Sequence, residues 1–71
     1  MSITNNNDLF IQYTIEGSGE VKKLPVKAED IYEDGVINRS KVVSLAASNE
    51  ASNGKAVINP IVLDSNLQPI N

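Results

Sequence analysis

The sequence has neither cysteine nor histidine to reinforce a chain of only 71 residues. A chain of this length buries only about 60% of the surface that its unfolded form exposes, so its hydrophobic core is small. Small domains are usually stabilised further by disulfides, a bound metal or association with other chains. Since the usual disulfide and zinc ligands are missing, we expect one small domain over residues 1–71, with no cofactor and no metal, supported by homo-oligomerisation or by a protein partner.

Charge is distributed unevenly along the chain. Twelve charged side chains lie between Met1 and Lys41, whereas only three, Glu50, Lys55 and Asp64, lie beyond. The weakly charged second half predicts a surface that the fold itself or a partner must cover. The net charge of −3 and the scattered positions of the six basic residues predict no binding to nucleic acid, because such binding depends on cationic contacts to phosphate.

Nothing in the sequence is typical of a targeting or membrane segment. Residues 2–8 are polar and lack the basic and apolar regions of a signal peptide. The uninterrupted apolar runs, such as Ala56–Ile58 and Ile61–Leu63, have no more than three residues, so we expect no membrane partner. We therefore expect a soluble, cytoplasmic protein of the producing or the host cell, and the lack of cysteine is consistent with a reducing compartment.

A strand over residues 8–16 is the most clearly predicted element. Apolar and polar side chains alternate here, which is typical of a strand with one buried face. The side chains expected to face the core are Leu9, Ile11, Tyr13 and Ile15. Phe10 lies on the otherwise polar face, where it is either an isolated exposed aromatic residue or an interface anchor.

A second strand over residues 20–26 is predicted to pair with the first through a tight turn at Gly17–Gly19. Pro25 has no N–H to donate to a neighbouring strand, so this strand is expected at an edge of the sheet. Lys22 and Lys23 would discourage its pairing with other chains. The two glycines match no phosphate-binding motif.

An acidic segment follows over residues 28–35. Its four carboxylates form a candidate acidic surface: Glu29, Asp30, Glu33 and Asp34. We expect one short helical turn that stops by Gly35, because early carboxylates suit a helix N-terminus and late ones do not. The surface is either simply solvated or used to bind a basic partner, and the spacing of its carboxylates does not match a calcium loop.

The stretch over residues 36–52 is compatible with a helix or a strand. Four residues share one helical face: Val42, Leu45, Ala46 and Asn49. Asn38 or Ser40 could cap the start, and Asn53–Gly54 could close the end, although many β-branched, serine and asparagine residues oppose a helix. We predict a short helix over residues 40–52; the alternative is an all-β oligomeric module in which Asn53–Gly54 joins two strands.

A third strand is predicted over residues 56–64. It is apolar on both faces, which is typical of a strand buried on both sides, and in so small a chain one face is expected to meet another subunit or a partner. Together with Phe10, the candidate interface residues are Val57, Ile58, Ile61, Val62 and Leu63. Pro60 predicts a bulge or bend. The polar residues 1–7 and the tail 65–71 are candidates for flexible segments.

The residue types of this chain favour no catalytic chemistry. An enzyme needs a tuned acid, base, nucleophile or metal, and without histidine and cysteine the carboxylates and the Ser40–Lys41 pair form no such set.

We predict an α+β domain with a small antiparallel sheet of about three strands and one short helix. The expected function is that of a non-enzymatic protein-interaction module that docks on or regulates a larger macromolecule, such as a virus-encoded accessory protein. The alternatives are a self-assembling structural subunit and a small-ligand binder with a pocket shared between subunits.

Overall fold

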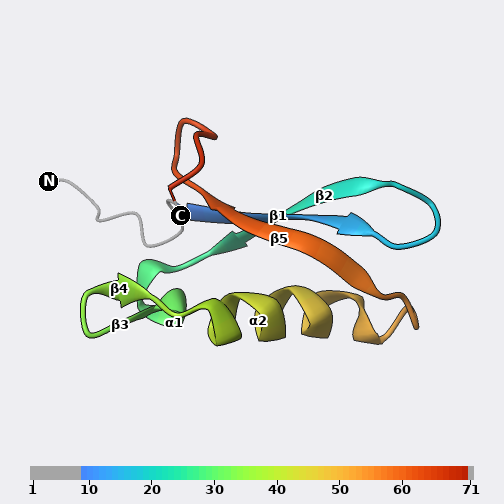
Figure 1. The fold of residues 1–71 in the computed structure, drawn as a ribbon, viewed down its shortest axis with the longest axis horizontal. Coiled ribbons are helices and arrows are strands. Elements are labelled where there is room, and N and C mark those ends of the chain that lie inside the picture. The colour runs from blue at the N-terminus through green and yellow to red at the C-terminus, as the bar shows by residue number, and fades with distance from the viewer. Residues whose placement is uncertain (1–8, 71) are drawn as a thin grey trace, which may run out of the picture.

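The computed structural model of the protein describes residues 9–70 and confirms the predicted α+β architecture (Figure 1). Its elements, in chain order, are β1 (Leu9–Ile15), β2 (Val21–Val26), α1 (Ala28–Ile31), β3 (Tyr32–Glu33), β4 (Val36–Ile37), α2 (Arg39–Ala51) and β5 (Val57–Leu63). Three strands form an antiparallel sheet in the order β2–β1–β5, β3 and β4 form a separate hairpin, and α2 lies along one face of the larger sheet. Over residues 9–70, no helix has the length and apolar character needed to span a bilayer. Residues 1–7, which were predicted to be flexible, lie outside the described residues.

β1 and β2 form the predicted hairpin. Gly17 and Gly19 have φ angles of 96° and 75°, which residues with a Cβ atom rarely adopt, so the reversal depends on glycine. The N–H of Gly19 donates to the carbonyl of Ile15 over 3.0 Å and closes the turn. β2 is an edge strand, as Pro25 predicted, and the complete burial of Tyr13 confirms the predicted register.

β5 pairs with the other side of β1 and contains a bulge. Ile58 and Ile61 of β5 lie opposite residues of β1 that are only two positions apart, so β5 has one extra residue between them. Asn59, next to Pro60, has a φ angle of 54° at this point, which confirms the predicted irregularity. Within the single chain, Val62 on the face of β5 toward α2 is fully buried, whereas Ile58 on the other face remains 39% exposed.

The predicted helix is present as α2. Asn38 caps its start, since the side-chain oxygen accepts hydrogen bonds from the N–H groups of Ser40 and Lys41 at 2.9 and 3.2 Å. The β-branched residues Val36 and Ile37, which opposed a helix in the sequence, lie before this cap and form β4. The conflicting signals therefore marked a boundary between two elements.

The hairpin of β3 and β4 was not predicted. Asp34 and Gly35 between the two strands have φ angles of 55° and 83°, both positive, as a two-residue type I′ turn requires. Asp-Gly is a favoured pair for this turn, but each strand has only two residues, too few to show an alternation in the sequence. α1 is one short turn that ends before Glu33, as the late carboxylates predicted.

The hydrophobic core lies between α2 and the face of the sheet that α2 covers. Its members come from β1, β2, α1, α2 and β5: Ile11, Tyr13, Ile15, Val26, Ile31, Val42, Ala46 and Val62. The residues of β1 that were predicted to face the core do so, with Leu9 packed against the cluster and only partly buried. The central strand of the sheet therefore supplies the middle of the core.

The tail after β5 folds back along the edge of the sheet. The side chain of Asp64 accepts hydrogen bonds from the N–H groups of Asn66 and Gln68 at 2.9 and 3.0 Å. The N–H of Ile70 then donates to the carbonyl of Val62 over 3.0 Å. These hydrogen bonds hold the tail up to residue 70 beside the end of β5, and the flexibility predicted for the tail stays a prediction.

Ile11→Ala should lower the free energy of unfolding by about 2–5 kcal/mol, because the truncation leaves a cavity at a fully buried position. Ile58→Ala is the matched control, since the same truncation at an exposed position should lower it by less than about 1 kcal/mol. Urea denaturation followed by circular dichroism measures both values. Equal losses for the two variants would contradict the register of β1.

Candidate functional site

The residues predicted to form an interface are divided between the two faces of the sheet. Those on the face away from α2 are Phe10, Ile58, Ile61 and Leu63. Val62 is fully buried in the core and Val57 packs against it, so both contribute to the fold of the single chain. The structure therefore brings only part of the predicted set together on one surface.

Cross-strand pairing defines the surface that α2 does not cover. Because the core residues of β1 face α2, the alternate residues of β1 point away from it, and their partners on β2 and β5 lie on the same side. This outer sheet face consists of Phe10, Gln12, Thr14, Val21, Lys23, Pro25, Ile58, Ile61 and Leu63. Val21 and Ile58 are its most exposed large apolar residues and lie on either side of Thr14. Leu63 is buried although it lies outside the core cluster, at the end where the tail rises on the side away from α2 (Figure 1).

Both edges of the sheet are protected against the addition of a further strand. At the β2 edge, Pro25 has no N–H to offer and Lys23 adds a charge. At the β5 edge, Pro60 also has no N–H, and its carbonyl accepts a hydrogen bond from Arg39 Nη2 over 2.8 Å. Ile70 of the tail pairs with part of the remaining edge. A partner is therefore expected to contact the face of the sheet and not to extend it.

An open groove of about 630 Å³ lies beside β5. We call it the edge groove, and its lining residues are Tyr32, Gly35, Val36, Ile37, Arg39, Ile61 and Ile70. Ile61 also belongs to the outer sheet face, so the two surfaces are continuous. Val36 is 65% exposed, the largest exposed fraction among the large apolar side chains of residues 9–70. The groove thus adds a second apolar area to the one on the sheet.

The candidate acidic surface is divided between α1 and the hairpin of β3 and β4, and only the hairpin lines the edge groove. Its members are all exposed: Glu29, Asp30, Glu33 and Asp34. Glu33 Oε1 accepts a hydrogen bond from Asn38 Nδ2 over 2.6 Å, which links the hairpin to the residue that caps α2. In the described part of the chain, no group of three or more acidic side chains is placed to hold a metal ion. The acidic surface therefore consists of separate, exposed carboxylates.

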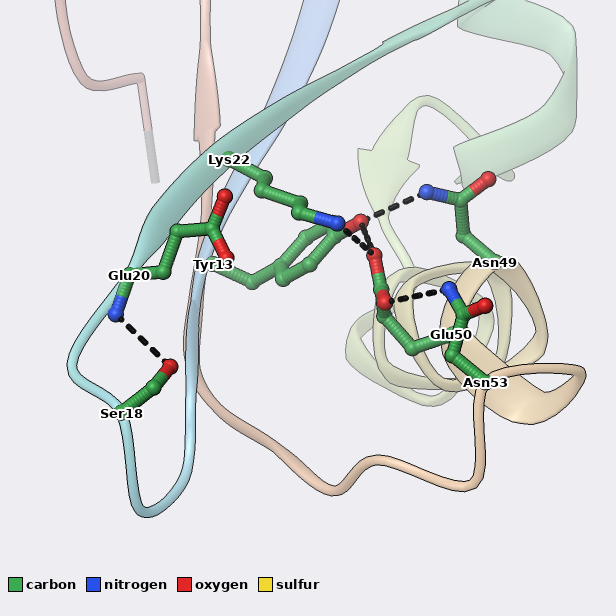
Figure 2. Close-up of polar contacts among 7 residues, drawn as sticks. All are labelled: Tyr13, Ser18, Glu20, Lys22, Asn49, Glu50 and Asn53. Carbon is green, nitrogen blue, oxygen red and sulfur yellow. Dashed lines mark hydrogen bonds and ion pairs between the residues drawn. The ribbon is translucent and has the colours of Figure 1, made fainter.

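A polar cluster around two buried side chains, Tyr13 and Glu50, joins the end of α2 to the hairpin of β1 and β2 (Figure 2). Glu50, in the last turn of α2, is 1% exposed. Tyr13 Oη donates to Glu50 Oε2 over 2.6 Å, and Lys22 Nζ lies 3.3 Å from the same oxygen. Asn53 Nδ2 donates to the other oxygen, Oε1, over 3.1 Å. Asn49 Nδ2 completes the cluster by donating to Tyr13 Oη over 2.6 Å.

The cluster stabilises the ionised form of Glu50 in spite of its burial. The hydrogen bond from Tyr13 is the main cause that lowers the pKa of Glu50, and the bonds from Asn53 and Lys22 act in the same direction against the effect of burial. The bond to Glu50 raises the pKa of Lys22. Burial, followed by the bond to Glu50, raises the pKa of Tyr13. At neutral pH the cluster therefore contains an anion, a cation and a neutral phenol.

This cluster was not predicted from the sequence. A carboxylate at the C-terminal end of a helix is opposed by the helix dipole, so Glu50 depends on the donors around it. Both of its oxygens are engaged by the chain itself, which suits a role in holding α2 to the sheet. Two signals existed: Glu50 is an isolated acid in a weakly charged segment, and Lys22 lies opposite Tyr13 in the hairpin register. Neither signal can be interpreted without knowing that α2 packs over β1.

Comparison of the chain with protein-family models, with curated proteins and with solved structures finds no match. The outer sheet face, the edge groove and the acidic surface are therefore the features that indicate a function.

Tyr13→Phe should lower the free energy of unfolding by about 1–3 kcal/mol, because the ring still fills the core but a hydrogen bond to a charged group is lost. Tyr32→Phe is the matched control, since Tyr32 is exposed and its hydroxyl should contribute less than about 0.5 kcal/mol. Chemical denaturation at neutral pH measures both. Two equally small effects would show that the cluster does not stabilise the fold.

The lowered pKa of Glu50 predicts that some stability is lost in acid. An unfolded glutamate has a pKa of about 4.3, so the contribution of Glu50 is complete above that pH and disappears as the pH falls through the lower pKa of the folded state. Glu50→Gln removes this titration and keeps the shape of the side chain. The difference in unfolding free energy between wild type and Glu50→Gln should therefore shrink as the pH falls from about 6 to about 3. Urea denaturation at constant ionic strength measures it, and a difference that does not change with pH would contradict the assignment.

Proposed function

We propose that this protein is a non-enzymatic, protein-binding module that docks on a larger macromolecule through the outer sheet face. The observation that carries the proposal is that α2 covers one face of the sheet, while Val21 and Ile58 stay exposed on the other. Apolar side chains that lie together on a face, and not singly, are typical of an interaction site. The proposed setting is the cytoplasm, since a chain without disulfides needs no oxidising compartment.

The size of the outer sheet face favours a partner that contacts more than this face. Three strands about 4.8 Å apart, with up to seven residues at about 3.4 Å each, present an area of roughly 350 Å². A stable interface usually needs about 800 Å² per partner. Because Ile61 connects the face to the edge groove, a large partner that contacts both surfaces buries more area than the outer sheet face alone provides.

The composition of the outer sheet face suits docking by a chain that also exists alone. Gln12, Thr14 and Lys23 lie between the apolar residues and keep the face compatible with water. Burying an exposed aliphatic side chain such as Val21 or Ile58 contributes at most about 1.5–3 kcal/mol. A few such contacts give a useful but reversible affinity.

The geometry gives less support to the two alternatives. The outer sheet face alone is also too small for stable self-assembly. In addition, two copies that each carry a charge of −3 repel each other. Small-ligand sites bury most of the ligand, whereas Val36, Ile70 and Tyr32 leave the edge groove open to solvent.

Ile58→Asp should weaken partner binding at least about tenfold with little effect on folding, because it places a charge at an exposed position within the outer sheet face. Val43→Asp is the matched control, since Val43 is a similarly exposed aliphatic residue on α2. Affinity capture from the producing cells, quantified by mass spectrometry, compares the two variants with wild type. Circular dichroism confirms that both are folded.

Equal capture of the partner by the Ile58→Asp and Val43→Asp variants would contradict the assignment of this face. Light scattering on the purified wild type covers the alternative of self-assembly. A stable multimer that Ile58→Asp dissociates would show that the protein is a structural subunit and not a docking module.

A further inference from the structure

We propose that the edge groove binds a segment of the partner protein in which aliphatic or aromatic side chains are flanked by lysine or arginine. This inference rests on the proposed function and names the chemistry of a second contact, beside the outer sheet face. It follows from the apolar lining of the groove and from the charge of the segment that forms one wall.

Apolar side chains from three separate segments converge on the groove. Val36 and Tyr32 come from the hairpin of β3 and β4, Ile61 comes from β5, and Ile70 comes from the tail. Val36, Tyr32 and Ile70 are each exposed, so the chain itself leaves them without full cover. The groove has a volume of about 630 Å³, and its open shape suits side chains that enter from another protein.

The hairpin wall of the groove carries negative charge. Glu33 and Asp34 lie in the chain between the lining residues Tyr32 and Gly35, and the other two members of the acidic surface, Glu29 and Asp30, lie on the preceding α1. Across residues 9–70 the single salt bridge joins Lys22 to Glu50, so none of the four carboxylates is neutralised by an ion pair. Exposed charges of one sign attract complementary charges on a partner and help to orient it. The flanks of the bound segment are therefore basic.

Arg39 is the one basic residue that lines the groove, and it has a structural role. Its Nη2 donates to the carbonyl of Pro60 over 2.8 Å, which ties the start of α2 to β5. Residues 27–41 carry four carboxylates against three cations, Lys27, Arg39 and Lys41, which gives a net charge of −1. The hairpin of β3 and β4, which lines the groove, carries Glu33 and Asp34 and no cation, and this wall agrees with a basic occupant.

The same charges disfavour other occupants. A second copy of this chain would bring an identical acidic segment to the groove, and like charges would oppose the contact. A strand that pairs with β5 would find the edge blocked at Pro60, at its carbonyl and at Ile70. Recognition through inserted side chains remains as the mode that the groove supports.

A phage-displayed library of random peptides of about 12 residues is the probe, selected on the full-length protein and then measured as synthetic peptides by fluorescence polarisation. Selected peptides should combine large apolar residues with flanking lysine or arginine and should bind more weakly at high salt. Val36→Asp should raise Kd at least about tenfold, because it charges the most exposed apolar residue of the groove without touching the core. The combined variant Glu29→Gln, Asp30→Asn and Asp34→Asn should raise Kd about threefold or more and flatten the salt dependence.

Ile58→Asp separates this proposal from the proposed function, because Ile58 lies on the outer sheet face and does not line the groove. Peptide binding should be unchanged in this variant, whereas cellular capture should be weakened. Failure to select any peptide, selection of peptides with acidic flanks, or an unchanged Kd for Val36→Asp would overturn the groove proposal and leave the capture result standing. A dimer in light scattering that Val36→Asp dissociates would overturn it too, by showing a second copy in the groove.

Discussion

The packing of α2 against β1 fixes the position of the other elements. β1 is the central strand, and the face that it shares with the core presents Ile11, Tyr13 and Ile15 to the helix. α2 is the one helix of the described chain that is longer than a single turn, so after it has covered this face no further helix is left for the other. The exposed apolar residues of the outer sheet face are thus a consequence of a one-helix architecture, and the tail shields only the end near Leu63. The same limit that makes the core small creates the surface that we assign to a partner.

The row of α2 residues that faces the sheet ends with a charged side chain. Val42, Ala46 and Glu50 are its buried residues and follow one another at intervals of four, so Glu50 occupies a place where an apolar residue would continue the core. An apolar residue there would avoid the free energy of burying a carboxylate. Our interpretation is that the bonds from Tyr13 and Lys22 fix the rotation and register of α2 over the hairpin, which a core this small and aliphatic specifies only weakly.

Local features of the sequence predicted most of the fold. Alternation gave β1, the glycines around Ser18 gave the hairpin, Pro60 gave the bulge and Asn38 gave the cap of α2. The parts that were missed depend on contacts between distant residues or on elements too short to form a pattern. Tyr13 and Glu50 are 37 positions apart, and β3 and β4 have two residues each.

The predicted interface on β5 was divided for a related reason. A strand that is apolar on both faces carries no signal for which alternate residues face the helix. The bulge at Asn59 shifts the alternation in the middle of β5, and only pairing with β1 shows that Val62 faces the core while Ile58 and Ile61 do not.

Solvent paramagnetic relaxation of methyl groups in the dilute, full-length protein tests most directly whether the outer sheet face is open. A soluble paramagnetic reagent broadens the signals of methyl groups that water reaches. We expect strong broadening for Ile58 and Val21, similar to that of Val43 on the surface of α2, and little for Ile11 and Val62 in the core. If Ile58 and Val21 are protected as well as Ile11 is, the face is already covered by the chain itself or by a second copy, and the central claim is wrong.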